Sequence, residues 1–252
     1  MLEGYPLERT WIDARSVFLS DLHIGWRYSR AQWLLDKLSA VRCEYLYLVG
    51  DTFEWTESSK DWLDKGTKAL RRAIEVLQSR GTSVFLISGN HDYRLIEGNS
   101  PLDCPTVPYC NHLSVRKQSF LVIHGDIFDL QYKHKGSSSE RVGSYMYSKL
   151  LWLGGVLQSR GIMPPRGVNH WATLWKSQFK DARVHMRRFQ RFMVKLSEIH
   201  RQDGVICGHI HRPAALETVH GLYFNCGDWV EHKSVLVETH TGDFRLTNDA
   251  TK

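Results

Sequence analysis

The sequence has no long apolar run and few cysteines. No stretch approaches the roughly 18 consecutive apolar residues that a membrane-spanning helix needs. The N-terminus lacks a basic segment followed by an apolar run, so we expect no signal peptide. The five cysteines include no C-x-x-C pair, which gives no sign of a disulfide framework. We therefore expect reduced thiols and a cytoplasmic protein.

Positive charge is concentrated in one part of the chain. Residues 130–200 contain 13 Lys or Arg and 3 Asp or Glu, a net charge of +10, whereas the whole chain carries +6. The rest of the chain therefore has a net charge of −4. A basic segment on a mildly acidic body predicts contact with phosphate, nucleic acid or an anionic membrane surface. A solvated charged face would give the same pattern.

Short apolar runs alternate with helical patterns in the first half of the chain. Helices are predicted over 30–40 and 62–79, between the first three of the predicted strands, and a β-α-β-α-β order favours a mostly parallel sheet covered by helices. The strands of the tail predict a second, more antiparallel sheet. The predicted strands are 17–19, 46–49, 84–87, 120–123, 204–207, 214–219, 222–225, 235–238 and 244–246.

Residues 131–200 interrupt this alternation, because they contain no convincing strand. A helix rich in large apolar groups is predicted over 141–157, and Pro164-Pro165 marks a break after it. The helix predicted over 173–200 has an apolar stripe and a basic stripe at helical spacing. We predict one domain over 1–252, with 131–200 as a basic helical cap inserted into it.

Clusters of metal-binding residue types directly follow five of the predicted strands. Loops at the carboxyl ends of strands in open α/β sheets meet at one crevice, so five such loops can surround one site. Carboxylate, amide oxygen and imidazole are ligands for divalent metals. The clusters are Asp21-Leu22-His23, Gly50-Asp51, Gly89-Asn90-His91-Asp92, His124-Gly125-Asp126 and Gly208-His209-Ile210-His211.

Together these clusters resemble the motif pattern of the calcineurin-like metallophosphoesterases. The resemblance runs from about residue 16 to residue 238 and implies a four-layer α/β/β/α sandwich of two mixed β-sheets. It also implies two divalent metal ions, with Mn²⁺ preferred and Fe, Zn or Mg as alternatives. By the family pattern, Asp51 bridges the two metals. The first metal is held by Asp21, His23, Asp51 and His211, and the second by Asp51, Asn90, His124 and His209.

The resemblance implies a hydrolytic reaction at phosphorus. Two metals about 3.5–4 Å apart clamp a phosphoryl group and lower the pKa of a bridging water, and the resulting hydroxide attacks in line. His91 is expected to protonate the leaving oxygen or to stabilise the transition state, and Asp92 to orient its ring. Arg94 and Arg212 are candidate phosphate contacts, and Asp228 is a further candidate near the substrate.

Within the family, the layout is most similar to the bacterial UDP-2,3-diacylglucosamine pyrophosphatase group. Those enzymes release UMP and an acylated sugar 1-phosphate for lipid A synthesis. The resemblance implies a lipid-linked substrate and peripheral attachment to the cytoplasmic face of the inner membrane. The chain departs from that group at His91, where the authenticated enzymes typically carry Arg.

Two other functions stay open at this point. The first is a different phosphodiesterase that acts on nucleotides or nucleic acid, whose phosphates the basic cap would contact. The second is a non-catalytic metal-binding scaffold. Intact ligand positions and an intact His91 favour an enzyme over the scaffold.

Overall fold

The computed structural model describes residues 12–55, 60–98, 100–132 and 180–247. Their contacts divide the chain into two compact units, one formed by residues 1–125 and 194–252 and the other by residues 126–193. Most of the predicted cap, including the helix over 141–157, lies outside the described residues. The single domain with a cap over 131–200 therefore stays a prediction.

The first sheet of the larger unit has six strands in the order β11-β10-β1-β2-β3-β4. Strands β1 to β4 run parallel to one another, whereas β10 and β11 are antiparallel to their neighbours. The inner strands are continuous apolar runs because both faces of this sheet are buried. The bounds are Ser16–Leu19 (β1), Tyr45–Val49 (β2), Ser83–Ile87 (β3), Thr106–Val107 (β4), Val235–Glu238 (β10) and Phe244–Thr247 (β11).

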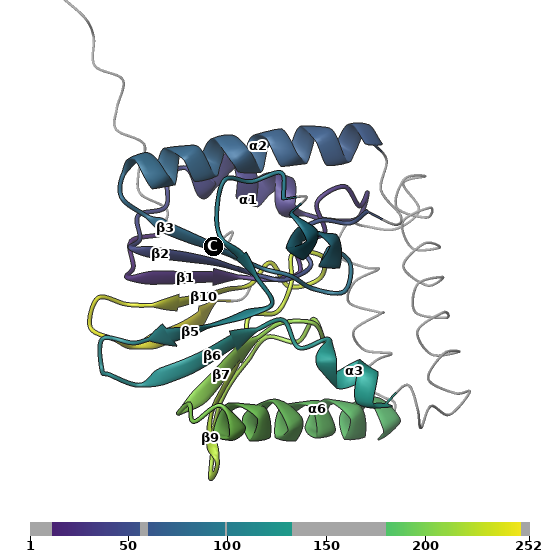
Figure 1. Cartoon of the computed structure of the whole chain (residues 1–252), viewed down its shortest axis with the longest axis vertical. Coiled ribbons are helices and arrows are strands. Elements are labelled where there is room, and N and C mark those ends of the chain that lie inside the picture. Colours follow the sequence, from purple (N-terminus) through teal and green to yellow (C-terminus); the bar gives the residue numbers. More distant parts are fainter. Residues whose placement is uncertain (1–11, 56–59, 99, 133–179, 248–252) are drawn as a thin grey trace, which may run out of the picture. The chain divides into compact units, whose positions relative to one another are not determined.

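Two helices cover one face of the first sheet (Figure 1). They are α1 (Ala31–Leu38) and α2 (Lys60–Ser79), and each presents an apolar stripe to the strands. Leu34 and Leu70 lie in one buried cluster with Leu46 of β2. This cluster is the core between the helices and the sheet.

The second sheet has five strands in the order β5-β6-β7-β9-β8. Strands β6, β7 and β9 are parallel, and β5 and β8 are antiparallel edge strands. A second buried cluster, which includes Phe18 and Phe120, lies between the two sheets. The bounds are Tyr109–Leu113 (β5), Ser119–Ile123 (β6), Gly204–Cys207 (β7), Ala214–Thr218 (β8) and Gly221–Asn225 (β9).

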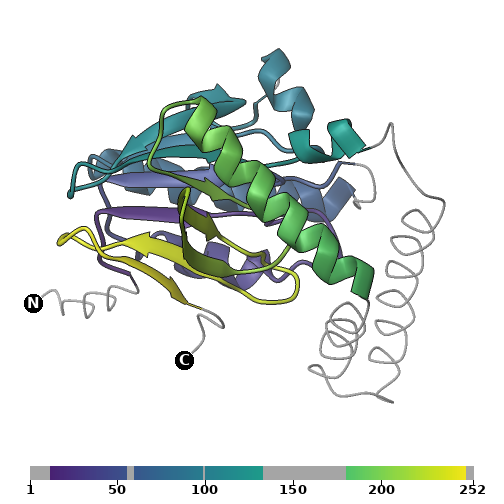
Figure 2. The same cartoon turned by 90° about the horizontal axis from the view of Figure 1, so that it is seen from below.

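The helix α6 (Lys180–Ile199) runs into the larger unit at residue 194. Within that unit its last turns lie on the outer face of the second sheet (Figure 2), where the ring of His200 contacts Tyr109 of β5. In the smaller unit, Phe128 of α3 (Ile127–Tyr132) packs against Phe189 and Phe192 of α6. None of the described helices is both long enough and apolar enough to cross a membrane.

The predicted α/β fold with two mixed sheets is confirmed, and each predicted strand is present. The assignment of the tail strands to one second sheet was wrong. β8 and β9 join the second sheet, whereas β10 and β11 extend the first. Prediction also missed β4 and β5, together with the 3-10 helix η1 (Tyr93–Glu97) and α3. β4 has only two residues, and β5 alternates exposed and buried positions without an apolar run.

Candidate metal centre

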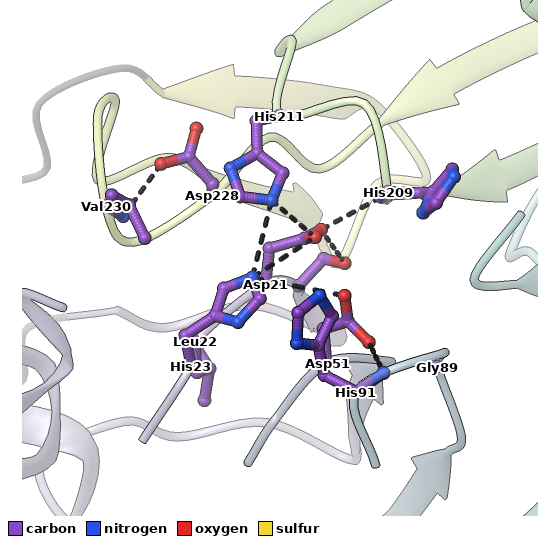
Figure 3. Close-up of polar contacts among 12 residues, drawn as sticks. Asp21, Leu22, His23, Asp51, Gly89, His91, His209, His211, Asp228 and Val230 are labelled. Carbon is purple, nitrogen blue, oxygen red and sulfur yellow. Dashed lines mark hydrogen bonds and ion pairs between the residues drawn. The ribbon is translucent and has the colours of Figure 1, made fainter. Parts of the chain in front are cut away.

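The loops that follow β1, β2, β3, β6 and β7 bring their acidic and histidine side chains together, and Figure 3 shows most of these side chains. Parallel strands of both sheets end at this edge, as expected for loops at the carboxyl ends of strands. Within each of three groups, the candidate ligand atoms all lie within 4.8 Å of one another. The groups are Asp21-His23-His211, His23-Asp51-His91 and Asp51-His124-His209.

The backbone at five predicted ligands adopts the left-handed conformation. This conformation is uncommon for residues other than glycine, and it persists where the surrounding structure enforces it, often at functional sites. Only eight non-glycine residues of the described chain have positive φ angles, so five of the eight are predicted ligands. Their φ angles are 53° (Asp21), 46° (His23), 49° (Asp51), 69° (His209) and 50° (His211).

Two glycines of the motifs leave room for these carboxylates. A Cβ atom at Gly208 would lie 1.9 Å from Ser20 Oγ and 2.5 Å from Asp21 Oδ2. A Cβ atom at Gly89 would lie 2.2 Å from Asp51 Oδ1. Such distances do not occur between real atoms, so the close approach of backbone and carboxylate requires glycine at both positions.

The donor atoms of the first group, Asp21, His23 and His211, point toward one another. Asp21 Oδ1 lies 3.0 Å from His211 Nε2 and 3.9 Å from His23 Nε2, and the two imidazole nitrogens lie 3.4 Å apart. Asp21 Oδ2 instead accepts hydrogen bonds from the Ser20 hydroxyl (2.6 Å) and the His209 backbone N–H (3.0 Å). One carboxylate oxygen is thus held by the protein while the other points at two imidazoles.

Asp51 joins the first group of donors to the second. Its Oδ2 atom lies 3.3 Å from His124 Nε2 and 3.9 Å from His23 Nε2. The other nitrogen of His124 lies 3.0 Å from the carbonyl oxygen of Val49 and donates to it, which leaves Nε2 directed at the site. Asn90, the remaining predicted ligand of this group, is exposed on the loop after β3.

These residues fit a pair of divalent metal ions. Asp21 and Asp51 are buried, and burial alone would raise the pKa of each carboxyl. The neighbouring imidazoles, His211 beside Asp21 and His124 beside Asp51, outweigh burial and lower both pKa values, so the carboxylates are ionised. Ionised carboxylates and imidazole nitrogens at this spacing are the donors that Mn²⁺, Fe and Zn accept.

His91 is oriented by Glu54 rather than by Asp92. Glu54 Oε2 lies 2.7 Å from His91 Nδ1 and 3.2 Å from His23 Nδ1. This contact with Glu54 raises the pKa of His91 to about 9 against the effect of burial. Sequence reasoning paired His91 with its neighbour Asp92, and that role was wrong. Glu54 comes three residues after the predicted ligand Asp51, on the same loop after β2, and this position was the signal for it.

Asp92 organises the loops around the site. Its two oxygens accept hydrogen bonds from the backbone N–H groups of Thr52 (2.7 Å), Phe53 (3.2 Å) and Gly89 (2.6 Å). Burial and the nearby Asp51 raise its pKa to about 6 despite these bonds. Asp92 therefore ties the loop after β3 to the loop after β2 and does not contact the His91 ring.

Asp228, like Asp92, binds backbone N–H groups and has a structural role. It is fully buried, its Oδ1 atom accepts from the Val230 backbone N–H (2.7 Å), and its Oδ2 atom lies 2.6 Å from His232 Nδ1. A hydrogen bond from the Glu231 backbone adds to these contacts. Because its oxygens face its own loop, we no longer place Asp228 against substrate.

The two candidate arginines lie beside predicted ligands in the sequence. The Arg94 guanidinium lies over the ring of Tyr93, 5.9 Å from its centroid, on the 3-10 helix that follows Asp92. Arg212 directly follows His211 and is half-buried. Both stay predictions as phosphate contacts.

Comparison with known proteins agrees with this geometry. The family model for calcineurin-like phosphoesterases matches residues 14–213. This chain belongs to the calcineurin-like phosphoesterases. With the His and Asp groups described above, it is a metal-dependent phosphoesterase.

Curated relatives match over most of the chain. A UDP-2,3-diacylglucosamine hydrolase of Wigglesworthia glossinidia brevipalpis is 26% identical and covers 79% of each chain. One of Marinobacter nauticus is 29% identical and covers 86% of this chain and 90% of its own. A solved structure described as a novel archaeal phosphodiesterase is 13% identical, with a TM-score of 0.45, and covers 92% of this chain and 98% of that chain.

Proposed function

We propose that this phosphoesterase cleaves the pyrophosphate bond of UDP-2,3-diacylglucosamine, or of a related nucleotide-lipid, into UMP and an acylated sugar 1-phosphate. The observation that carries the proposal is the match to curated UDP-2,3-diacylglucosamine hydrolases, which are 24–29% identical and span 79–92% of this chain. The convergence of the donor groups supplies the chemistry that this reaction needs.

The protein side of the reaction follows from the site. Two divalent ions, for which we propose Mn²⁺, would neutralise phosphoryl charge and lower the pKa of an attacking water. The first is expected to be held by Asp21, His23, Asp51 and His211, and the second by Asp51, Asn90, His124 and His209. His91 Nδ1 faces Glu54, so Nε2 is the nitrogen that can protonate the leaving oxygen. The Glu54 carboxylate raises the pKa of His91, which favours the protonated ring that an acid requires.

The test measures Mn²⁺-dependent release of UMP from UDP-2,3-diacylglucosamine by the wild type and by Asp51→Asn. A chromogenic phosphodiester serves as the control substrate. UMP release that is lost in the variant supports the proposal. If the wild type hydrolyses only the chromogenic ester, the protein is still a phosphoesterase but the proposed lipid substrate is refuted. Turnover by Asp51→Asn would refute the expected bridging role of Asp51.

A second candidate is a phosphodiesterase that acts on nucleotides or nucleic acid. The observation that favours it is His91, which stands where the authenticated pyrophosphatases typically have Arg. An imidazole that donates a proton suits phosphodiesters whose leaving oxygen is a poor leaving group. Hydrolysis of a dinucleotide or of single-stranded DNA at a rate above that of UDP-2,3-diacylglucosamine would select this candidate.

We also propose that the enzyme binds the anionic cytoplasmic face of the inner membrane through α6. Arg183, Arg187, Arg191 and Lys195 are exposed at four-residue spacing along this helix, which places them in one row. Within the described residues the three arginines form no ion pair. Each such charge contributes roughly 1 kcal/mol near an anionic surface. Sedimentation with vesicles of anionic lipid, but not with neutral vesicles, would support this contact, and Arg187→Glu with Arg191→Glu should abolish it.

A further inference from the structure

The loop between β1 and α1 carries two aromatic residues beside the candidate metal centre. Trp26 follows the predicted ligand His23 by three residues, and the centroids of their rings are 5.9 Å apart. The ring of Tyr28 meets that of Trp26 edge-on, with a centroid distance of 5.3 Å. A group bound next to His23 would therefore lie close to Trp26.

Neither aromatic residue serves the hydrophobic core. Trp33, Trp55 and Trp229 pack in or against the cluster beneath α1 and α2. Trp26 and Tyr28 belong to neither cluster of the described residues and are only partly buried. Burial in a core, the usual reason for a large aromatic side chain, does not account for this pair.

Hydrogen bonds fix the loop that holds this pair. The backbone N–H of Trp26 donates to the His23 carbonyl (3.0 Å), and the backbone N–H of Ser29 donates to the Trp26 carbonyl (3.0 Å). The Ser29 hydroxyl donates to the Leu22 carbonyl, and the Arg30 N–H donates to the Trp229 carbonyl (2.7 Å). The backbone that carries the indole is thus held in place relative to the metal ligands, as a preorganised binding surface requires.

Tyr28 has a polar group that lacks a partner. Its hydroxyl is buried and makes no hydrogen bond in the described structure, which is uncommon for a buried hydroxyl. The guanidinium of Arg27 lies 5.0 Å from the centroid of the Tyr28 ring. The pair is therefore accompanied by an unused hydrogen-bonding group and a positive charge.

We propose that Trp26 and Tyr28 form the nucleobase site of this enzyme, with the base stacked on the Trp26 indole and a polar group of the base on the Tyr28 hydroxyl. This rests on the proposed function insofar as the substrate carries a nucleotide. A base presents a flat π-face and polar edges, which match an indole and an unpartnered hydroxyl. An acyl chain offers neither, and the Arg27 charge disfavours it.

The experiment compares two chromogenic phosphodiesters that differ in the base. Thymidine 5′-(p-nitrophenyl phosphate) carries a nucleobase, and p-nitrophenyl phosphorylcholine does not. Trp26→Ala should raise KM for the thymidine ester about 5- to 150-fold, the range for loss of one base-stacking contact, and leave KM for the choline ester unchanged. Trp26→Phe should retain most of the affinity. Tyr109→Ala, at an exposed aromatic that contacts His200, is the matched control and should change neither KM.

Binding of UMP, measured by equilibrium dialysis, gives a readout independent of turnover. Trp26→Ala and Tyr28→Phe should each weaken UMP binding, and Tyr28→Phe should leave the melting temperature unchanged or raised because it removes an unpartnered buried hydroxyl. Equal KM increases for both esters would overturn the base site and make Trp26 a support for His23. Unchanged KM and unchanged UMP affinity would also overturn it.

The base site and the lipid substrate can fail separately. A KM effect confined to the thymidine ester, without hydrolysis of UDP-2,3-diacylglucosamine, would support the base site and refute the lipid substrate. Hydrolysis of UDP-2,3-diacylglucosamine with the same KM in wild type and Trp26→Ala would support the lipid substrate and refute the base site.

Discussion

Replacing the buried Glu238 by Gln should remove a charge that joins the two sheets. Glu238 ends β10, and its side chain is completely buried. Its Oε2 atom lies 2.8 Å from Arg15 Nη1, 2.7 Å from Ser16 Oγ and 2.8 Å from His112 Nε2. Its Oε1 atom accepts the Val115 backbone N–H at 2.8 Å. His112 belongs to β5 of the second sheet, so the carboxylate connects both sheets.

The size of the effect follows from the pKa of Glu238. Burial alone would raise it, but the hydrogen bonds from His112, Val115 and Ser16 lower it from 4.5 to about 2. A shift of this size corresponds to about 3 kcal/mol of folding free energy. Because the folded pKa is depressed, this stability is fully present above pH 4.5 and is lost as the pH falls from about 4.5 to about 2.

Urea unfolding of the wild type and Glu238→Gln, at pH 7 and at pH 3.5, measures this contribution. At pH 7 the variant should be less stable by about 3 kcal/mol, and at pH 3.5 the difference should narrow by about 1.4 kcal/mol. Asp243→Asn removes an exposed pair with Arg116 and should cost less than about 1 kcal/mol at neutral pH. A difference between wild type and Glu238→Gln that does not change with pH would refute the reasoning.

Three further predictions concern the site. Glu54→Gln should lower kcat about 10- to 100-fold on a chromogenic diester, because the ring of His91 loses its charged partner, and an unchanged kcat would contradict this role. Gly208→Ala should abolish Mn²⁺ binding, measured by calorimetry, because its Cβ would overlap Ser20 Oγ, and wild-type affinity would show that the loop can move aside. Mn²⁺ at 100 times its dissociation constant should stabilise the wild type by about 2.7 kcal/mol, and EDTA should reverse the rise in melting temperature. Asp51→Asn should show a much smaller rise than the wild type, and an equal rise would place the ion elsewhere.

The convergence of the candidate ligands could be predicted because their clusters come within a few residues of the ends of apolar strands. Strands buried on both faces are continuous apolar runs, so β1, β2 and β7 could be located to within a residue. Their parallel arrangement then brings Asp21, Asp51 and His209 to one edge. The apolar runs locate the ends of the strands, and the parallel arrangement places those ends at one edge. The donor groups could therefore be predicted.

Side-chain partners were harder to predict than strand positions. Asp92 is the neighbour of His91 in sequence, yet three backbone N–H groups bind its oxygens, and Glu54 reaches His91 from another loop. No sequence pattern distinguishes a carboxylate that binds backbone from one that binds a ring. β5 was missed for a related reason, because its pairing with β6 and not its own composition makes it a strand.

The left-handed backbone at the predicted ligands limits which amino acids this site can use. Asp, Asn and His accept that conformation several times more readily than most residues, and they are also oxygen and nitrogen donors for metals. A β-branched donor such as Thr at position 21 or 211 would be strained by the left-handed backbone, whatever its affinity for the metal. The chemical repertoire of the centre is therefore set by the path of the main chain as well as by the ion, and substitutions that look conservative by donor type are not conservative here.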